Sequence, residues 1–457
     1  MNEVRRYFFI GIGGIGMSAL ARYFAAEGCQ VAGYDKTSST LTESLKEEGI
    51  EVIYNDEVDN IPAEFRRIDE WLTIVRTPAV PLDSELNRFY KEKQASVKKR
   101  SEILASIANS KRCIAVAGTH GKTTTTSILG HILFNSSLGC TAFVGGILSQ
   151  YDSNVLIDPK SPFVVLEADE FDRSFHHLNP EIAVVTSTDA DHLDIYGSQK
   201  EFELAFSLFL DKVHGRAFVH SSIPKKIKGK KSLSYGIEDG DIQAIHIRVE
   251  NGRFHFDIEA DRMQMLNVSI SLPGRHNILN ALAAVSVCKE LGLDNEQIRS
   301  GISSYKGVKR RFEFVSCDES IVFIDDYAHH PSEINACISS VRELYPNRKI
   351  TAVFQPHLFS RTRDFMEGFA ISLSAADEVI LVPIYPAREK PIPGVSSQAL
   401  LERLSVTNKV LCEKEELPSL IARRELEVLL TMGAGDIDRE IPRIQSQLNN
   451  RLTTGRT

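Results

Sequence analysis

Short apolar runs recur along the chain, and most of them end in glycine or polar residues. The first run covers 7–10 and leads through glycines into a segment with helical spacing at 17–27. A second short apolar segment follows at 29–35. This order predicts a strand, a helix and a second strand, which is how a nucleotide-binding α/β unit begins.

A second series of apolar runs predicts a central parallel sheet. Its strands are expected at 113–117, 163–169 and 182–187. Each run ends in polar residues, and the carboxyl ends of strands are where open α/β sheets bind ligands. After about residue 240 apolar and polar residues alternate, which predicts a small antiparallel part before an alanine-rich helix at 277–290.

A third series follows the point near Arg311 where the central region closes. Its helical patterns alternate with predicted strands at 321–326, 350–356, 378–384 and 428–436. This alternation predicts another doubly wound parallel sheet. The tail from about Arg443 is expected to form a terminal helix, and we interpret the basic stretch 91–100 as a solvated helix end or linker.

Length and composition restrict the function classes. A chain of 457 residues is long enough for about three domains. The 42% apolar and 25% charged residues are typical of globular proteins, and the net charge of −8 gives no electrostatic footprint for nucleic acid. Scattered cysteines without a C-x-x-C pair, no signal peptide and no apolar run of about 20 residues favour a cytoplasmic enzyme without a membrane span.

A glycine-rich turn follows the first predicted strand. Gly11, Gly13 and Gly16 fit the spacing G-x-G-x-x-G, and Asp35 lies near the end of the next strand, where an acid that binds ribose is expected. Backbone N–H groups at a helix start favour any diphosphate. The motif therefore leaves a dinucleotide, another nucleotide or an unliganded turn open.

The segment GTHGKTT at 118–124 is a shortened relative of the phosphate-binding loop G-x-x-x-x-G-K-[ST], with Val116 where the first glycine usually stands. Gly118 and Gly121 allow a tight backbone, Lys122 can reach the phosphates, and the Thr123 hydroxyl can bind Mg²⁺. The alternative is a structural glycine turn. Its position between a buried strand and a helix favours nucleotide binding.

Acidic residues follow the next two predicted strands. The segment EADEFD at 167–172 contains four carboxylates, of which Glu167 is a candidate Mg²⁺ ligand beside a phosphate. His192 stands between Asp191 and Asp194 and is a candidate metal ligand or oriented base. A solvated acidic loop and a structural histidine are the alternatives.

Further candidates lie in later segments. Asn277 and Asn280 share one helix face and can read an adenine edge, although helix capping is equally consistent. Arg310 and Arg311 can clamp phosphate or form a hinge ion pair. The third module carries polar groups after successive strands, which suggests another substrate: Asp325, Asp326, His329, His330, then His357, Arg361 and Arg363, then the glycines of GAGD at 433–436. The segment with His357, Arg361 and Arg363 is expected to give fixed positive charge suited to an amino-acid carboxylate.

The motifs described above, taken in order, resemble those of the Mur ligases of peptidoglycan synthesis. They are GIGGIG, AGTHGKTTT, EADEFD, DADHLD, RHNILNALAA, KRRFE, DDYAHHPSE, FQPHLFSRTRD and GAGD. The resemblance covers nearly the whole chain. It implies an α/β protein with a Rossmann-like UDP-sugar-binding domain at 1–105, a central P-loop ATPase domain at 106–312 with a parallel sheet plus a small antiparallel part, and a Rossmann-like amino-acid-binding domain at 313–457.

The reaction implied by the resemblance uses ATP to phosphorylate the lactyl carboxylate of UDP-N-acetylmuramate. The amine of L-alanine then attacks the acyl phosphate. The implied cofactor is Mg²⁺, with Mn²⁺ as a substitute, and the implied state is a monomer or homodimer. No nucleic-acid partner is expected.

The resemblance also implies residue roles. The catalytic residues would be Lys122, Glu167, His192, His330 and Arg361, with Thr123, Glu167 and His192 as metal ligands. ATP would be bound by Gly118, Thr119, His120, Gly121, Lys122, Thr123, Thr124, Asn277, Asn280, Arg311 and Asp326. The UDP-sugar would be bound by Gly11, Gly13, Gly14, Ile15, Gly16, Asp35 and Thr77, and the amino acid by His330, His357 and Arg361.

The chain departs from the family pattern at two places. One affects the amino-acid site, and the other bears on which branch of the family the chain resembles. Leu358 stands where related sequences commonly carry arginine, so Arg361 or Arg363 must supply that charge. Residues 201–211 contain no lysine, whereas later-acting family members use a carbamylated lysine in this region. This absence fits the alanine-adding branch. The alternatives are a recycling ligase that adds a tripeptide, an NAD-dependent dehydrogenase and a non-catalytic UDP-sugar binder.

Overall fold

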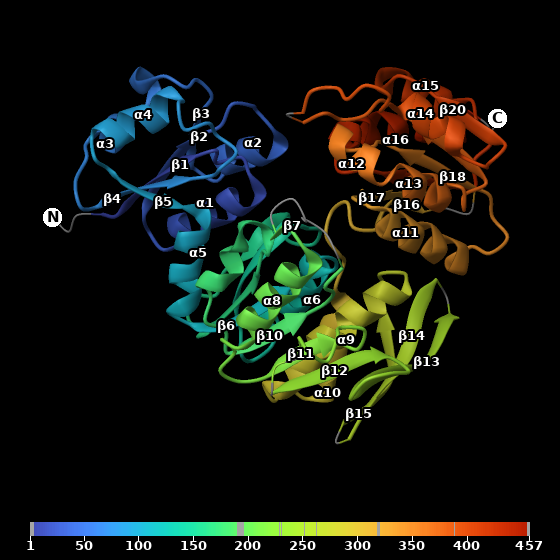
Figure 1. Ribbon diagram of the computed structural model, residues 1–457, viewed down its shortest axis with the longest axis horizontal. Coiled ribbons are helices and arrows are strands. Elements are labelled where there is room, and N and C mark those ends of the chain that lie inside the picture. The colour runs from blue at the N-terminus through green and yellow to red at the C-terminus, as the bar shows by residue number, and fades with distance from the viewer. Residues whose placement is uncertain are drawn as a thin grey trace. The chain divides into compact units, whose positions relative to one another are not determined.

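The computed structural model describes residues 4–189, 196–227, 229, 231–250, 252–261, 263–317, 320–387 and 389–454. Contacts divide the chain into two compact units, which are considered separately. The first unit holds 1–247, 256–269 and 279–306, and the second holds 248–255, 270–278 and 307–457. The described residues form three sheets with mostly parallel pairs (Figure 1). The predicted α/β class is confirmed, while the domain limits 1–105, 106–312 and 313–457 stay a prediction.

The amino-terminal sheet has five parallel strands in the order β3-β2-β1-β4-β5. The strands are β1 Arg6–Ile10, β2 Gln30–Tyr34, β3 Glu51–Ile53, β4 Leu72–Arg76 and β5 Ser96–Lys99. The helices are α1 Ile15–Ala26, α2 Thr40–Glu47, α3 Ala63–Arg66, α4 Glu85–Glu92 and α5 Arg100–Asn109. Successive side chains of β1 pack in two separate cores, since neighbours in a strand point to opposite faces.

The interpretation of the basic stretch 91–100 as a solvated helix end or linker holds only for its first residues. These residues end α4, but Ser96–Lys99 form β5, which pairs with β4 in parallel. An edge strand has one neighbour and needs no continuous apolar run, so its polar sequence carries little strand signal. Arg100 then begins α5.

The central sheet has the order β15-β14-β13-β12-β11-β10-β6-β9-β7-β8. Its strands are β6 Arg112–Ala117, β7 Thr141–Leu148, β8 Ser153–Leu156, β9 Phe163–Glu167, β10 Ile182–Val185, β11 Ala217–His220, β12 Ser232–Ile237, β13 Ile242–Glu250, β14 Arg253–Ala260 and β15 Met263–Ile270. The accompanying helices are α6 Lys122–Phe134, α8 Gln199–Leu210, α9 Arg275–Glu290 and α10 Asn295–Ser304. The pairs from β13 through β12, β11, β10, β6 and β9 to β7 are parallel.

The alternating pattern after residue 240 corresponds to β13, β14 and β15, which are neighbours in the sheet. The alternating pattern therefore predicts these strands correctly, while their antiparallel pairing stays a prediction.

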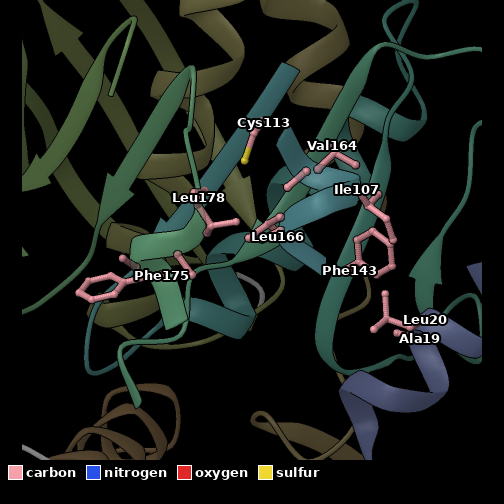
Figure 2. Close-up of a cluster of buried hydrophobic side chains, with 14 of the residues drawn as sticks. Ala19, Leu20, Ile107, Cys113, Phe143, Val164, Leu166, Phe175 and Leu178 are labelled. Carbon is pink, nitrogen blue, oxygen red and sulfur yellow. The ribbon is translucent and has the colours of Figure 1, made fainter. Parts of the chain in front are cut away.

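The amino-terminal sheet and the central sheet share one core in the first unit. Figure 2 shows Ala19 and Leu20 of α1 near Phe143 of β7, with Ile107 of α5 beside the central strands. Next to this core, buried Asn154 of β8 accepts a hydrogen bond from Arg22 at 2.6 Å and donates one to Ser18 at 2.8 Å. Apolar packing and a buried polar contact thus both fix α1 on the central sheet.

The carboxyl-terminal sheet has the order β16-β17-β21-β18-β19-β20, and only the β16–β17 pair is antiparallel. Its strands are β16 Glu313–Cys317, β17 Val322–Asp326, β18 Ile350–Phe354, β19 Glu378–Leu381, β20 Asn408–Leu411 and β21 Val428–Met432. Its helices are α11 Pro331–Leu344, α12 Phe359–Asp364, α13 Met366–Leu373, α14 Ser397–Arg403, α15 Leu417–Ala422 and α16 Ile441–Thr454. Two hydrophobic cores cover the two faces, as a doubly wound sheet requires.

A buried polar network fixes α6 to α10 within the first unit. His131 Nδ1 accepts a hydrogen bond from the Gln150 amide at 3.0 Å, and its Nε2 lies 2.9 Å from the hydroxyl of Ser304. Burial lowers the pKa of His131 to about 4. The neutral ring is therefore the form that the fold requires.

We predict that His131→Gln changes the pH dependence of stability. An unfolded chain protonates this histidine near pH ~6.5, so the free energy of unfolding of the wild type falls as pH drops from there toward 4. The variant is less stable at pH 7.5, and its deficit shrinks at pH 5. Melting temperatures followed by circular dichroism measure this, with exposed His246→Gln as the control. An equal deficit at both pH values would contradict the prediction.

Candidate functional site

The first glycine turn connects β1 to α1, and the residues that surround it hold its backbone in place. The Gly13 amide donates to the Asp35 carboxylate at 2.9 Å, and Gly14 is the residue that precedes Ile15 at the start of α1. Gly11 has a φ of +89°, and a side chain there would collide with Thr77. The structure thus brings the predicted UDP-sugar residues together, with Asp35 bound to the turn itself.

Arg100 is a site candidate that the sequence reasoning missed. A β-carbon on Gly16 would lie 2.9 Å from the Arg100 guanidinium, which is also 3.7 Å from the carboxylate of Asp169. Arg100 therefore lies between the glycine turn and the acidic segment at 167–172. The available signal was its position at the end of a basic run that precedes a helix.

The second glycine turn connects β6 to α6, as the sequence predicted. Gly121 has a φ of +82° and immediately precedes α6. Gly118 has a φ of +132°, and a β-carbon there would lie 2.8 Å from the backbone nitrogen of Ser187. Both positions therefore need glycine. Lys122 begins α6, and the hydroxyl-bearing Thr123 and Thr124 follow it in buried positions.

Residues after β10 support this turn. The hydroxyl of Ser187 accepts a hydrogen bond from the His120 amide at 2.9 Å, and its carbonyl accepts one from the Thr119 amide at 3.3 Å. Thr119 also donates through its hydroxyl to the carbonyl of Asp189 at 2.9 Å. The predicted strand end at 182–187 is shorter in the structure, because β10 ends at Val185 and the next residues hold the turn.

The acidic segment after β9 faces the phosphate loop. Glu167 accepts a hydrogen bond from the Gly145 amide at 2.6 Å, and its negative charge contributes to raising the pKa of Lys122. Glu170 lies 2.8 Å from the Lys122 ammonium. His192, a predicted metal ligand, lies outside the described residues.

The two asparagines lie inside α9, which begins at Arg275, so neither caps the helix. In the first unit, Asn280 accepts a hydrogen bond from the buried Thr125 hydroxyl at 3.1 Å, and its side chain lies against Gly121. In the second unit, Asn277 donates to the carbonyl of Pro273 at 2.7 Å. Asn280 is therefore directly linked to the phosphate loop.

In the second unit, acidic residues end β17 beside two arginines. Burial raises the pKa of Asp326 to about 6, and the nearby charge of Arg311 opposes this shift. Asp326 accepts backbone hydrogen bonds from Phe312 and Ala328, each at 2.7 Å. Arg310 is a structural residue, since it donates to the buried carboxylate of Asp325 at 3.2 Å, as in the predicted hinge ion pair.

Histidines and Arg361 gather at the ends of β17 and β18 in the same unit. His330 precedes α11, and its Nδ1 accepts a hydrogen bond from the Ser332 amide at 3.3 Å. His357 stacks on Tyr385 with the ring centroids 5.8 Å apart. Arg361 lies close enough to lower the pKa of both His329 and His357.

The prediction of positive charge from His357, Arg361 and Arg363 was wrong for His357, and Arg363 is already ion-paired. Burial lowers the pKa of His357 to about 4, so its ring is neutral at pH 7. Arg363 is bound to Asp364 at 2.7 Å on an exposed part of α12. Within the described chain, the guanidinium of Arg361 has no hydrogen-bonded or ion-paired partner, so this residue is the anion-binding candidate of the cluster.

Two other features bear on where a ligand binds. A hollow of about 860 Å³ lies at the amino ends of β6, β9 and β10, where Arg112 and Glu181 neutralise each other. The phosphate loop lies at the other end of the strands, after the carboxyl end of β6. Among the described residues, no group of three His, Cys, Asp or Glu side chains forms an all-protein metal site. None of the described helices is long and apolar enough to cross a membrane.

Comparison with known proteins gives matches along the whole chain. Family models match at 6–112 (Mur ligase family, catalytic domain), 116–288 (Mur ligase middle domain) and 310–435 (Mur ligase, glutamate ligase domain). The UDP-N-acetylmuramate–L-alanine ligase of Christiangramia forsetii is 49% identical over 451 residues, which are 98% of each chain.

Solved structures give the same result. The UDP-N-acetylmuramate–alanine ligase of Thermotoga maritima has a TM-score of 0.84 and 27% identity, covering 97% of this chain and 99% of that chain. A murein peptide ligase from Psychrobacter arcticus has a TM-score of 0.71 and 21% identity, covering 98% and 99%. The latter likeness concerns the fold alone.

We predict that Gly121→Ala weakens nucleotide binding. The added methyl group would meet the Asn280 oxygen at 2.5 Å, and the φ of +82° adds strain of about 1–2 kcal/mol. We expect the Kd for a fluorescent ATP analogue to rise about tenfold or more, measured by titration. Gly292→Ala is the matched control, because Gly292 has a φ of +86° with no atom within 4 Å. Equal Kd values for both variants would contradict the assignment.

Proposed function

Because the chain belongs to the Mur ligase family, we propose that it uses ATP to join L-alanine to UDP-N-acetylmuramate in the synthesis of peptidoglycan precursors. The observation that carries this function is the 49% identity, over 98% of both chains, to an enzyme named for that reaction. The phosphate loop between β6 and α6 supplies the expected place for ATP.

The proposed chemistry has two steps. A lactyl carboxylate oxygen attacks the γ-phosphorus of ATP, the bond to the bridging oxygen breaks, and ADP leaves. The amine of L-alanine then attacks the acyl carbon, phosphate leaves with its oxygen, and the nitrogen loses a proton. Such a reaction depends on positioning and on neutralising phosphate charge.

Residues of the first unit suit the first step. We assign Lys122 to the transferred phosphoryl group, because its ammonium lies in the turn that precedes α6. We assign the glycine turn at 11–16 and Arg100 to the diphosphate of the UDP-sugar, since backbone N–H groups and a guanidinium both favour phosphate. Asn280 would serve the nucleotide from its place beside Gly121.

The donor set also fits Mg²⁺. This ion prefers one or two carboxylates together with phosphate oxygens and water, so a three-residue protein site is not required. Glu167, the last residue of β9, and Thr123, in the first turn of α6, would hold it. Bound Mg²⁺ would neutralise charge on the phosphates. We propose the cytoplasm, where ATP and UDP-sugars are available, as the site of the reaction.

The recycling ligase is the second candidate. The 21% identity to the murein peptide ligase concerns the fold alone and does not favour this candidate. The alanine ligase is favoured by the higher whole-chain identity of 49%.

We predict that phosphate release needs all three substrates: ATP, UDP-N-acetylmuramate and L-alanine. An acyl phosphate forms only when the carboxylate is present, and it turns over only when an amine attacks it. A coupled phosphate assay with each substrate omitted in turn measures this. Release without UDP-N-acetylmuramate, or with a tripeptide in place of alanine, would overturn the proposed function.

We predict that Arg361→Ala raises the KM for L-alanine about 30-fold, the effect of one lost charge-assisted hydrogen bond. Arg363→Ala is the matched control in the same helix, because that guanidinium is already bound to Asp364 and should leave KM within about twofold. Initial rates at varied alanine and saturating ATP measure both. A larger effect at Arg363 than at Arg361 would reverse the assignment.

A further inference from the structure

Lys122 of the phosphate loop forms a buried ion pair with Glu170 of the acidic segment at 167–172. The Lys122 ammonium is 2.8 and 2.9 Å from the two carboxylate oxygens of Glu170 and 2.6 Å from the carbonyl of Gly118. The Glu170 side chain is 1% exposed and that of Lys122 is 18% exposed. A buried carboxylate and a buried ammonium each require a partner of opposite charge.

The backbone around Glu170 is fixed independently of the lysine. The Glu170 carbonyl accepts a hydrogen bond from the Tyr196 hydroxyl at 2.6 Å and another from the Arg173 amide at 3.0 Å. The amide of Phe175 donates to the carbonyl of Asp169 at 3.1 Å. The carboxylate is thus presented from a rigid turn, and the longer, more flexible lysine side chain adapts to it.

The geometry leaves one lysine donor for a ligand. An ammonium has three N–H donors. Gly118 takes one and Glu170 takes a second, which its two oxygens share. Burial alone would lower the pKa of Lys122, but the charges of Glu170, Asp169 and Glu167 raise it, so the ammonium stays protonated.

We propose that Glu170 is a positioning residue for the phosphoryl transfer. It holds the Lys122 ammonium in one orientation, so that its third N–H meets the transferred phosphoryl group without side-chain rearrangement. This inference rests on the proposed function, because it takes ATP as the ligand of the loop. A structural role alone predicts a different kinetic result.

Glu170→Gln is the central test. Loss of the fixed orientation lowers kcat about tenfold or more. Loss of a negative charge beside the phosphates leaves the KM for ATP unchanged or lower. Glu170→Asp keeps the charge, but its shorter side chain restores kcat only in part.

Glu378→Gln is a matched control for the loss of a buried ion pair. The Glu378 side chain is also 1% exposed and lies 2.7 Å from Lys349, at the amino end of β19. This variant should lower the melting temperature without moving kcat or KM. If Glu170→Gln behaves in the same way, the positioning role is overturned while the ATP-dependent ligase activity stands.

Lysine labelling provides a readout that does not need turnover. An amine-acylating reagent, followed by mass spectrometry at one fixed pH, reports how accessible the Lys122 amine is in each variant. Faster labelling of Lys122 in Glu170→Gln than in the wild type supports the proposal, because the side chain is no longer held against the loop. Equal labelling rates overturn it, whether or not the wild type ligates alanine.

Discussion

Close backbone packing at the turn from β6 to α6 is the constraint on which the phosphate site depends. Gly118 and Gly121 both have positive φ, and each lies against another segment with no space for a β-carbon. The segment after β10 and Asn280 of α9 occupy that space. Three distant parts of the sequence are thereby fixed around one lysine, and small shifts in any of them would move its ammonium.

The same packing explains how the site tolerates its charges. Acidic residues at strand ends are stable only beside cations or backbone donors. In the first unit, Lys122 and Arg100 lie beside Glu170 and Asp169. In the second unit, backbone amides and Arg311 only partly offset burial, so the pKa of Asp326 remains raised to about 6. The hollow at the amino ends of β6, β9 and β10 contains an internally neutralised pair instead.

Much of this arrangement could be predicted from the sequence, because buried parallel strands leave continuous apolar runs. The strands at β6, β9, β18 and β21 and the start of α11 at Pro331 follow from such runs and from turn chemistry. The edge strand β5 could not be predicted in this way, because its one-sided pairing permits a polar sequence. Arg100 was missed for the same reason, since it directly follows that strand.

Long-range electrostatics limited the prediction of the second cluster. Sequence position placed His357, Arg361 and Arg363 together, but it could not show that burial neutralises His357 or that Asp364 binds Arg363. The first effect depends on packing between segments, whereas the second joins two adjacent, exposed residues of α12. Leu358 also has an unusual backbone conformation. Its φ is +70°, a value that residues with a side chain rarely adopt.

That unusual backbone explains why the loss of an arginine at 358 need not remove the charge from the cluster. The Leu358 amide donates to the carbonyl of Tyr385 at 3.0 Å, and its own carbonyl accepts a hydrogen bond from the Thr362 amide at 3.1 Å. The start of α12 is thus held by main-chain bonds that do not involve the side chain at 358. Arg361 is carried by this helix, so its position depends on the backbone turn rather than on the side chain at 358.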